Sequence, residues 1–477
     1  YAEKFYAVRY APPPISPAWS NRLGATWIAD NVYHDDYFIR GAGYLPGFVL
    51  REGNGILSIA GGLSAILEPA TDDLAFVAGF STRGDGAVRI ATNAAGHELL
   101  WFGGYRCRNA ADLPALQPGV ALSTAAAPHD NALFRYAPAA PGSSVAFVLS
   151  DAAANVPVRV FNGDAQLVAS GDGSAMLDFD ADDTDEIFVF IASPVPVEFD
   201  IKAIDVTETR AALRQTLAQF PDLPGIAVAA REPGFLPIVV AEGLASVSPD
   251  RTLEGHEQFH IASISKTFTA AAVFLLQQQG LLNISNTVDV YAPELGVPRA
   301  ADITVEHLLQ HRSGLPDANN TAWIDGQLVK DRFQEFTVEE IVAVARHLYP
   351  NLMFEPGSNY HYSDTGFNIL ARIVENVSGT NYQAFVQQNV LDPLGLANTF
   401  APLHSQVSVP EPAMDSYMFL GDAFTDTSDW NPSVEFGCGS VISTLEDLLA
   451  AADGFFLSTN LLTSETHALM MDPVSPG

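Results

Sequence analysis

The pattern of apolar residues changes character near residue 207, and this change constrains the fold more than any other feature of the chain. Before it, short apolar runs alternate with glycine and aspartate turns, a pattern typical of antiparallel β structure. After it, helix-length segments dominate, such as residues 263–279 and 337–348. Strands followed by helices predict an α+β domain in the C-terminal half.

The N-terminal half predicts additional all-β segments. Residues 66–125 form a β-rich accessory segment in this interpretation. Residues 126–204 form a small β-sandwich-like module, because four apolar runs between residues 144 and 191 are separated by turns. The α+β domain then covers residues 205–477.

The charge of the chain limits its partners. Acidic residues outnumber basic ones 56 to 23, which gives a formal net charge of −33. Phosphate backbones would be repelled, so we expect no nucleic-acid partner. No stretch approaches the roughly 18 apolar residues that a membrane span needs. The acidic composition, the four lysines and the start at Tyr1 predict a secreted or periplasmic bacterial protein.

A zinc-binding pattern occurs at His256-Glu257-Gln258-Phe259-His260. On a helix, histidines four residues apart share one face and can bind zinc, with the glutamate as base. Here Phe259 and Ile261 alternate with polar residues, as in a strand, where residues four apart lie about 13 Å from each other. We therefore expect no metal, and a zinc peptidase stays an alternative.

A second pattern is Ser263-Ile264-Ser265-Lys266. A serine and a lysine three residues apart meet on one helical face, which suits a nucleophile beside an amine. The following stretch, residues 267–276, is almost wholly apolar and should be buried. A lysine on the first turn of a buried helix is costly unless it is paired, so Lys266 is a candidate functional residue.

A third pattern is Tyr362-Ser363-Asp364, which follows a proline-glycine turn. A tyrosine just before a helix can point into a cleft and relay a proton. The alternative is a core tyrosine, with Ser363 or Asp364 as the helix cap. The chain has no Walker A loop and no G-x-G-x-x-G motif, so we expect no nucleotide cofactor.

Together these patterns resemble the serine β-lactamase and penicillin-binding-protein-like family, in its class C-like branch of esterases and D-aminopeptidases. The resemblance rests on five stretches in the family's order: residues 259–266, 303–316, 356–367, 392–396 and 439–444. It implies an antiparallel sheet flanked by helices plus a helical subdomain. It also implies that Ser263 attacks a carbonyl, that Lys266 and Tyr362 manage its proton, and that the Ser263 N–H is one oxyanion donor.

Asp364 departs from the family, which often has asparagine at this position. A carboxylate near Lys266 would favour the charged ammonium, and Tyr362 would then be the base. Alternatively, Asp364 caps the helix and never reaches the lysine. The sequence leaves both open.

A second departure concerns the last strands of the catalytic sheet. No H-x-G or K-T-G motif follows Thr444. Residues 41–48 resemble the family's H-x-G-x-x-P-G-F stretch, with Gly41 in place of histidine. Residues 1–65 could therefore supply the missing strands through a permuted or reordered chain, with the Tyr44 N–H as second oxyanion donor. The alternatives are an unrelated β module, or a second chain or fragment that completes the sheet.

The sequence thus predicts a serine hydrolase that cleaves amide or ester bonds of a small molecule or peptide through an acyl-Ser263 intermediate. Two alternatives belong to other classes. One is the zinc peptidase with His256, Glu257 and His260, and the other is an inactive binding protein on the same fold.

Overall fold

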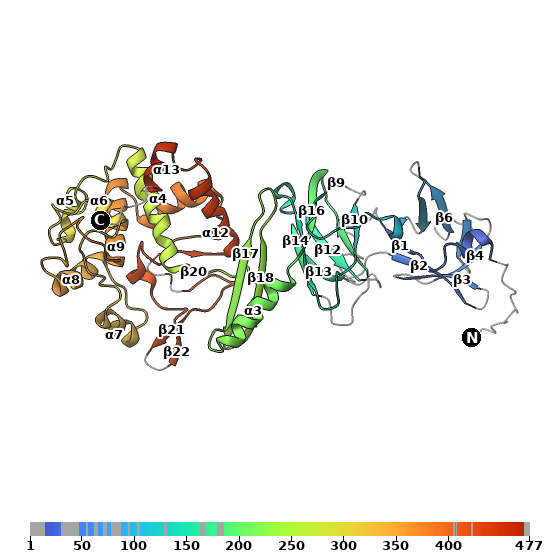
Figure 1. The fold of residues 1–477 in the computed structure, drawn as a ribbon, viewed down its shortest axis with the longest axis horizontal. Helices are drawn as coiled ribbons and strands as arrows, with labels where there is room; N and C mark the ends of the chain where they lie inside the picture. The colour runs from blue at the N-terminus through green and yellow to red at the C-terminus, as the bar shows by residue number, and fades with distance from the viewer. Residues whose placement is uncertain are drawn as a thin grey trace, which may run out of the picture. The chain divides into compact units, whose positions relative to one another are not determined.

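The computed structural model describes residues 15–29, 47–53, 56–61, 65–69, 74–77, 87–93, 96–102, 105–127, 131–162, 167–178, 186–403, 406, 408–420 and 423–471. The chain divides into two compact units, which are described one at a time (Figure 1). The first contains Tyr1–Ala212 and Arg231–Ile238, and the second contains Leu213–Ala230 and Val239–Gly477.

The first unit begins with an antiparallel barrel. Its eight strands pair in chain order, and β1 pairs with both β2 and β8, which closes the barrel. Trp19, from the short helix α1 (Pro17–Ser20), and Trp27 are fully buried in its core. The strands are β1 (Thr26–Ala29), β2 (Gly47–Gly53), β3 (Ile56–Gly61), β4 (Ala65–Pro69), β5 (Leu74–Val77), β6 (Ala87–Thr92), β7 (Glu98–Phe102) and β8 (Tyr105–Asn109).

This barrel changes the interpretation of residues 1–65. β2 pairs with β1 and β3, and β3 pairs with β2 and β4, so both edges of each strand are occupied within the barrel. The pairing gives no support to the hypothesis that these strands complete the catalytic sheet. It favours the alternative of a separate β module, because closing a barrel leaves no open edge. The motif residues 41–46, with Tyr44, lie outside the described residues.

Two four-stranded antiparallel sheets follow in the same unit. Their orders are β10-β15-β12-β13 and β14-β11-β16-β9. Residues from both sheets, such as Phe134, Phe147, Val189 and Ile201, form one apolar core, as in a β-sandwich. The strands are β9 (Leu122–Ala126), β10 (Ala132–Tyr136), β11 (Ser144–Leu149), β12 (Pro157–Phe161), β13 (Leu167–Asp172), β14 (Ser174–Asp178), β15 (Ile187–Ile191) and β16 (Val197–Asp205).

The second unit combines short antiparallel sheets with helices. One sheet has the order β17-β18-β19, and two further pairs are β20-β23 and β21-β22. These strands are β17 (Gly225–Ala230), β18 (Ile238–Val247), β19 (Asp250–Thr252), β20 (Phe259–His260), β21 (Tyr417–Leu420), β22 (Ala423–Asp426) and β23 (Ile442–Ser443). Helix α3 (Thr207–Gln219) leads from the first unit into the second.

The helices of the second unit pack around α4 (Ser265–Gln278) and α9 (Asp364–Ser378), which contact each other. Every residue of α4 from Ser265 to Leu276 is buried or half-buried, and the part from Ala270 to Leu276 is apolar on all faces. The remaining helices are α5 (Val288–Tyr291), α6 (Val305–Leu309), α7 (Ala322–Lys330), α8 (Val338–Leu348), α10 (Tyr382–Val386), α11 (Asp392–Leu394), α12 (Leu445–Ala452) and α13 (Ser464–Met470). Among the described residues, none of the helices combines the length and apolar character that crossing a bilayer requires.

Candidate active site

Ser263 lies in the tight turn that joins β20 to α4. The turn is a 3₁₀ helix, Ala262–Ile264, and Ser263 is exposed on it. Ala262 has a φ of 46°, a left-handed conformation that costs roughly 1–2 kcal/mol for a residue other than glycine. On one side the turn is held by the Ile261 N–H, which donates to the Val441 oxygen at 3.0 Å. The strained turn therefore presents the Ser263 hydroxyl outward from a fixed backbone.

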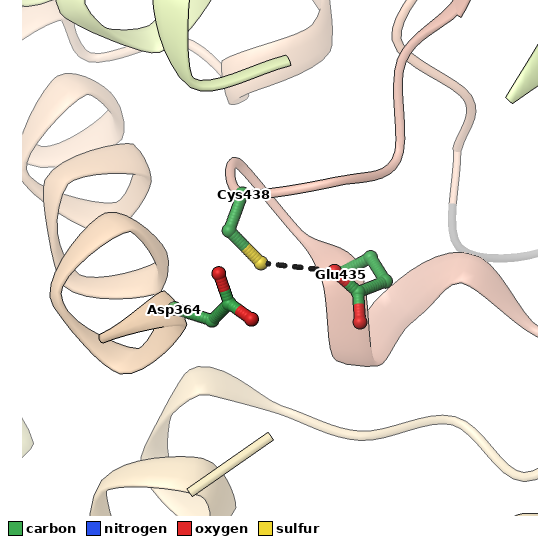
Figure 2. A group of neighbouring side chains, drawn as sticks. All are labelled: Asp364, Glu435 and Cys438. Carbon is green, nitrogen blue, oxygen red and sulfur yellow. Dashed lines mark hydrogen bonds between the residues drawn. The ribbon is translucent and has the colours of Figure 1, made fainter. Parts of the chain in front are cut away.

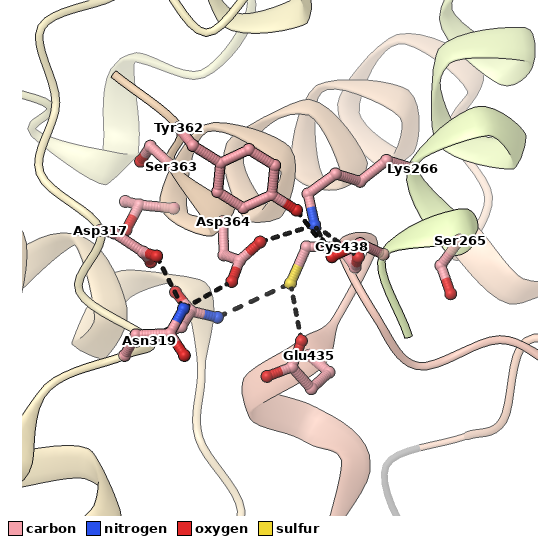
Figure 3. A network of polar contacts seen from close by, with 12 residues as sticks. Ser265, Lys266, Asp317, Asn319, Tyr362, Ser363, Asp364, Glu435 and Cys438 are labelled. Carbon is pink, nitrogen blue, oxygen red and sulfur yellow. Dashed lines mark hydrogen bonds and ion pairs between the residues drawn. The ribbon is translucent and has the colours of Figure 1, made fainter. Parts of the chain in front are cut away.

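Lys266 lies one turn further along, and its amine points toward Tyr362, Asp364 and Cys438 (Figure 3). It is only 7% exposed. Its Nζ donates to Ser263 Oγ at 3.1 Å and to the Cys438 carbonyl oxygen at 2.8 Å. Burial alone would lower the pKa of Lys266, but Cys438, Asp364 and Tyr362 outweigh burial and raise it. The amine is therefore a charged ammonium at neutral pH.

Tyr362 approaches Ser263 from the residues just before α9. Its hydroxyl lies 2.6 Å from Ser263 Oγ, and Lys266 Nζ lies 4.9 Å from the centre of its ring. The ring stacks on His311 at 4.4 Å, and His311 Nδ1 accepts the Ser363 N–H at 3.2 Å. The two contacts orient the phenol toward the serine.

Asp364 is the first residue of α9, and it reaches the lysine. Its Oδ1 lies 2.6 Å from Lys266 Nζ, in an ion pair whose side chains are 9% and 8% exposed. Its Oδ2 accepts a hydrogen bond from Asn320 Nδ2 at 2.9 Å, and the same amide donates to Asp317 at 2.7 Å. Of the two alternatives that the sequence left open, the structure has the contact with Lys266.

Sequence reasoning missed a group beneath this ion pair (Figure 2). Asp364, Glu435 and Cys438 each offer one ligand atom, and these atoms lie within 4.8 Å of one another. That spacing could admit a cation, but Asp364 already binds the Lys266 ammonium, and the Cys438 thiol donates to Glu435 Oε2 at 3.3 Å. Burial raises the pKa of Glu435 and of Cys438, and the Asp364 charge adds to both. In the structure, Asp364 and the Cys438 thiol are thus each already engaged by a protein group.

The side chains of the zinc-binding pattern are not arranged as zinc ligands would be. His256 Nδ1 lies 2.5 Å from Glu446 Oε1. The Glu257 carboxylate accepts the N–H groups of Glu254 and Gly255 at 2.8 and 2.7 Å. His260 lies on strand β20, where burial lowers its pKa. Because His256 and Glu257 each have their own partner, this arrangement gives no support to a shared metal.

A hollow of about 310 Å³ opens beside Lys266. Most of its lining is apolar and comes from α4, α9 and the helices around them. Its apolar residues include Ala270, Phe274, Ile284, Phe367, Phe456 and Leu469.

Residues 213–477, more than half of the chain, match the family model described as Beta-lactamase. The chain belongs to the beta-lactamase family. The match contains Ser263, Lys266 and Tyr362, and it covers the described part of the second unit from its first residue. The family predicted from the sequence motifs is therefore confirmed.

Among curated proteins, this beta-lactamase family chain is 32% identical over 187 residues to penicillin-binding protein 4* of Bacillus subtilis, which covers 39% of this chain and 40% of that protein. It is 30% identical over 221 residues to esterase EstB of Burkholderia gladioli, which covers 43% of this chain and 54% of that protein. The chain thus spans about half the length of these relatives, or less.

Among solved structures, a D-stereospecific amidohydrolase from Streptomyces sp. matches with a TM-score of 0.50 and 26% identity. The match covers 56% of this chain and 78% of the amidohydrolase. It confirms the predicted fold, in which antiparallel sheets combine with helices as in the β-lactamase type.

Proposed function

We propose that the chain is a serine hydrolase that cleaves amide or ester bonds through an acyl-Ser263 intermediate. One observation carries this proposal. The Ser263 hydroxyl lies within hydrogen-bond distance of both Lys266 Nζ, at 3.1 Å, and the Tyr362 hydroxyl, at 2.6 Å. A nucleophile needs an adjacent group to take its proton, and this arrangement supplies both the acceptor and a neighbouring positive charge.

The ion pair with Asp364 supports Tyr362, rather than Lys266, as the group that takes the proton. Because Lys266 is an ammonium, it has no free lone pair and cannot serve as the base. In our proposal Tyr362, deprotonated beside the ammonium, accepts the proton as Ser263 Oγ bonds to the carbonyl carbon. The Ser263 N–H donates to the resulting oxyanion. Tyr362 then protonates the leaving amine or alcohol, and a water molecule, activated by Tyr362, releases the acid from Ser263.

The names of the relatives support amides and esters as the substrate bonds, since one is an esterase and another a D-stereospecific amidohydrolase. We propose small-molecule or peptide substrates for this chain.

The test is intact-mass measurement of the chain of residues 1–477 after reaction with a fluorophosphonate or penicillin probe. The wild-type chain should gain one adduct, and Ser263→Ala should gain none. Ser285→Ala is the matched control, because Ser285 is exposed and lies outside the site, and it should be labelled like the wild type.

Three results would contradict the proposal. Labelling that persists in Ser263→Ala would place the nucleophile elsewhere. An unlabelled wild-type chain that also fails to hydrolyse a panel of esters, D-amino amides, peptides and β-lactams would favour a binding protein. Hydrolysis that a chelator abolishes, but that survives in Ser263→Ala, would favour the zinc alternative.

Two further proposals concern the surroundings of the enzyme. A second chain or fragment would complete the sheet, since β17 is the terminal strand of its described sheet and Val228 on it is 40% exposed. The molar mass in solution, measured by light scattering, tests this. The acidic composition supports secretion or a periplasmic location, which fractionation of the producing cells tests.

A further inference from the structure

Glu435 ends a short 3₁₀ helix, Pro432–Glu435, just before the loop that carries Cys438. Its backbone oxygen accepts three successive N–H groups, from Cys438 at 3.0 Å, Gly439 at 2.9 Å and Ser440 at 3.1 Å. The residues from Cys438 to Ser440 therefore form a tight turn wrapped around the carbonyl of Glu435.

The Glu435 side chain folds over the same turn (Figure 2). Its Oε2 accepts the Cys438 thiol at 3.3 Å. A Cβ atom at position 439 would lie only 2.2 Å from that oxygen, so the carboxyl group lies directly against Gly439. The side-chain amides of Asn319 and Asn368 approach Cys438 Sγ at 3.6 and 3.7 Å, and both also donate to the Val434 oxygen. The thiol is thus held between the carboxyl group and two amides.

This arrangement bears on the catalytic amine, because the Cys438 carbonyl oxygen accepts a hydrogen bond from Lys266 Nζ at 2.8 Å. We propose that Glu435 is a positioning residue of the site, which holds the turn at Cys438 so that this carbonyl fixes the Lys266 ammonium beside Ser263. The inference rests on the proposed function. Nothing in the five family stretches of the sequence includes Glu435, and its role follows from the contacts alone.

The surroundings indicate that Glu435 acts in its neutral form. The charged and titratable groups that face it are Asp364, Lys266, Asp317 and Cys438. The Lys266 charge is already balanced by Asp364 at 2.6 Å, so a second carboxylate would be left without a cation. Burial, and then the Asp364 charge, raises the pKa of Glu435 accordingly. A neutral amide of the same shape should therefore replace the acid.

The experiment measures the acylation rate of the full chain by time-resolved intact mass with the fluorophosphonate or penicillin probe, across neutral and alkaline pH. Glu435→Ala should slow acylation about tenfold. The turn at Cys438 loses its contacts with the Glu435 side chain, and the Lys266 ammonium is then no longer held in a fixed position. Glu435→Gln should restore the rate to within about twofold of wild type, with the same pH profile. Glu465→Ala, at an exposed position on α13, is the matched control and should match the wild type.

Gly439→Ala disturbs the same contact while Glu435 itself is kept, because the added methyl group would displace the Glu435 carboxyl group. It should also slow acylation, and it carries the test if Glu435→Ala does not fold, as judged by thermal unfolding. A folded Glu435→Ala with the wild-type rate would overturn the inference. The inference would also be overturned if the pH profile of Glu435→Gln differed from that of the wild type. It would be overturned as well if the purified wild-type chain held a stoichiometric metal that Glu435→Ala lost. A wild-type chain that no probe labels would instead overturn the proposed function itself.

Discussion

Lys266 Nζ lies 2.6 Å from Asp364 Oδ1, and the same nitrogen donates to Ser263 Oγ at 3.1 Å. The Lys266 amine thus contacts both the Asp364 carboxylate and the proposed nucleophile, Ser263. A buried ion pair of this kind keeps the amine protonated, because losing the proton would leave the carboxylate without a partner. In the proposed mechanism the pair therefore gives the lysine an electrostatic role and leaves the proton transfer to Tyr362.

Asp364→Asn should move the alkaline limb of the labelling rate to lower pH. The carboxylate is among the groups that raise the pKa of Lys266, and the amide cannot replace its charge. The lysine would then lose its proton, and with it the positive charge beside Tyr362, at a lower pH. The measurement is the rate of labelling by the fluorophosphonate probe against pH.

Asp289→Asn is the control for this prediction, because Asp289 is exposed on α5 and away from the lysine. Its pH profile should equal that of the wild type. An unchanged alkaline limb in Asp364→Asn would show that the ion pair does not set the charge of Lys266. A rate that instead rises with pH as Lys266 loses its proton, with this rise moved to lower pH in Asp364→Asn, would point to lysine as the base.

Tyr362→Phe should lower kcat/KM by roughly a hundred- to ten-thousand-fold, the usual range for removing a general base. The substitution removes the hydroxyl at 2.6 Å from Ser263 Oγ but keeps the ring that stacks on His311. Tyr360→Phe is the matched control, since Tyr360 is 62% exposed and also lies near His311. Equal kcat/KM values for the two variants would exclude Tyr362 as the base.

Local spacing was enough to predict the nucleophile contact. Ser263 and Lys266 lie three residues apart at the start of a helix, so their meeting follows from helical geometry alone. Their contact with Tyr362 is long-range, and it was expected only because the order of the motifs resembles a known family. The contact between Asp364 and Lys266 stayed open, because a cap residue and an ion-pair partner look the same in sequence.

No sequence motif predicted the turn at Cys438, whose carbonyl oxygen contacts Lys266. Glu435 and Cys438 belong to no motif, and their effect comes from a backbone carbonyl, which every residue possesses. The barrel was missed for another reason. Residues 41–48 resemble a family stretch, whereas Asn54-Gly55 lies between two apolar runs and is a strong sequence signal for a local hairpin. The strands on either side, β2 and β3, do pair with each other.

His311 should make the stability of the fold depend on pH. Burial, and then the Lys266 charge, lowers its pKa from the usual 6.5 to about 4, although the Asp364 charge opposes this. Between these values the unfolded chain binds a proton that the folded chain does not, so stability falls as the pH drops from 6.5 toward 4. The loss amounts to roughly 3 kcal/mol.

The variant that tests this is His311→Asn, because His311 has a φ of 56° and asparagine tolerates the left-handed region. Urea unfolding at several pH values should show a shallower decline for this variant than for the wild type. His347→Asn, at an exposed position on α8, should keep the wild-type slope. Parallel slopes for all three proteins would mean that His311 titrates normally in the folded chain.

The left-handed turn at Ala262 leads to a prediction about stability. Replacing alanine by glycine should stabilise the chain at this turn and destabilise it inside a helix. Ala262→Gly should raise the free energy of unfolding by about 1 kcal/mol, because glycine adopts the φ of 46° without steric cost. Ala270→Gly, inside helix α4, should lower it by a similar amount, since glycine there loses more backbone entropy than alanine. Denaturant unfolding measures both. If Ala262→Gly destabilises the chain as much as Ala270→Gly does, the turn at Ala262 stores no strain, and the outward presentation of Ser263 needs another cause.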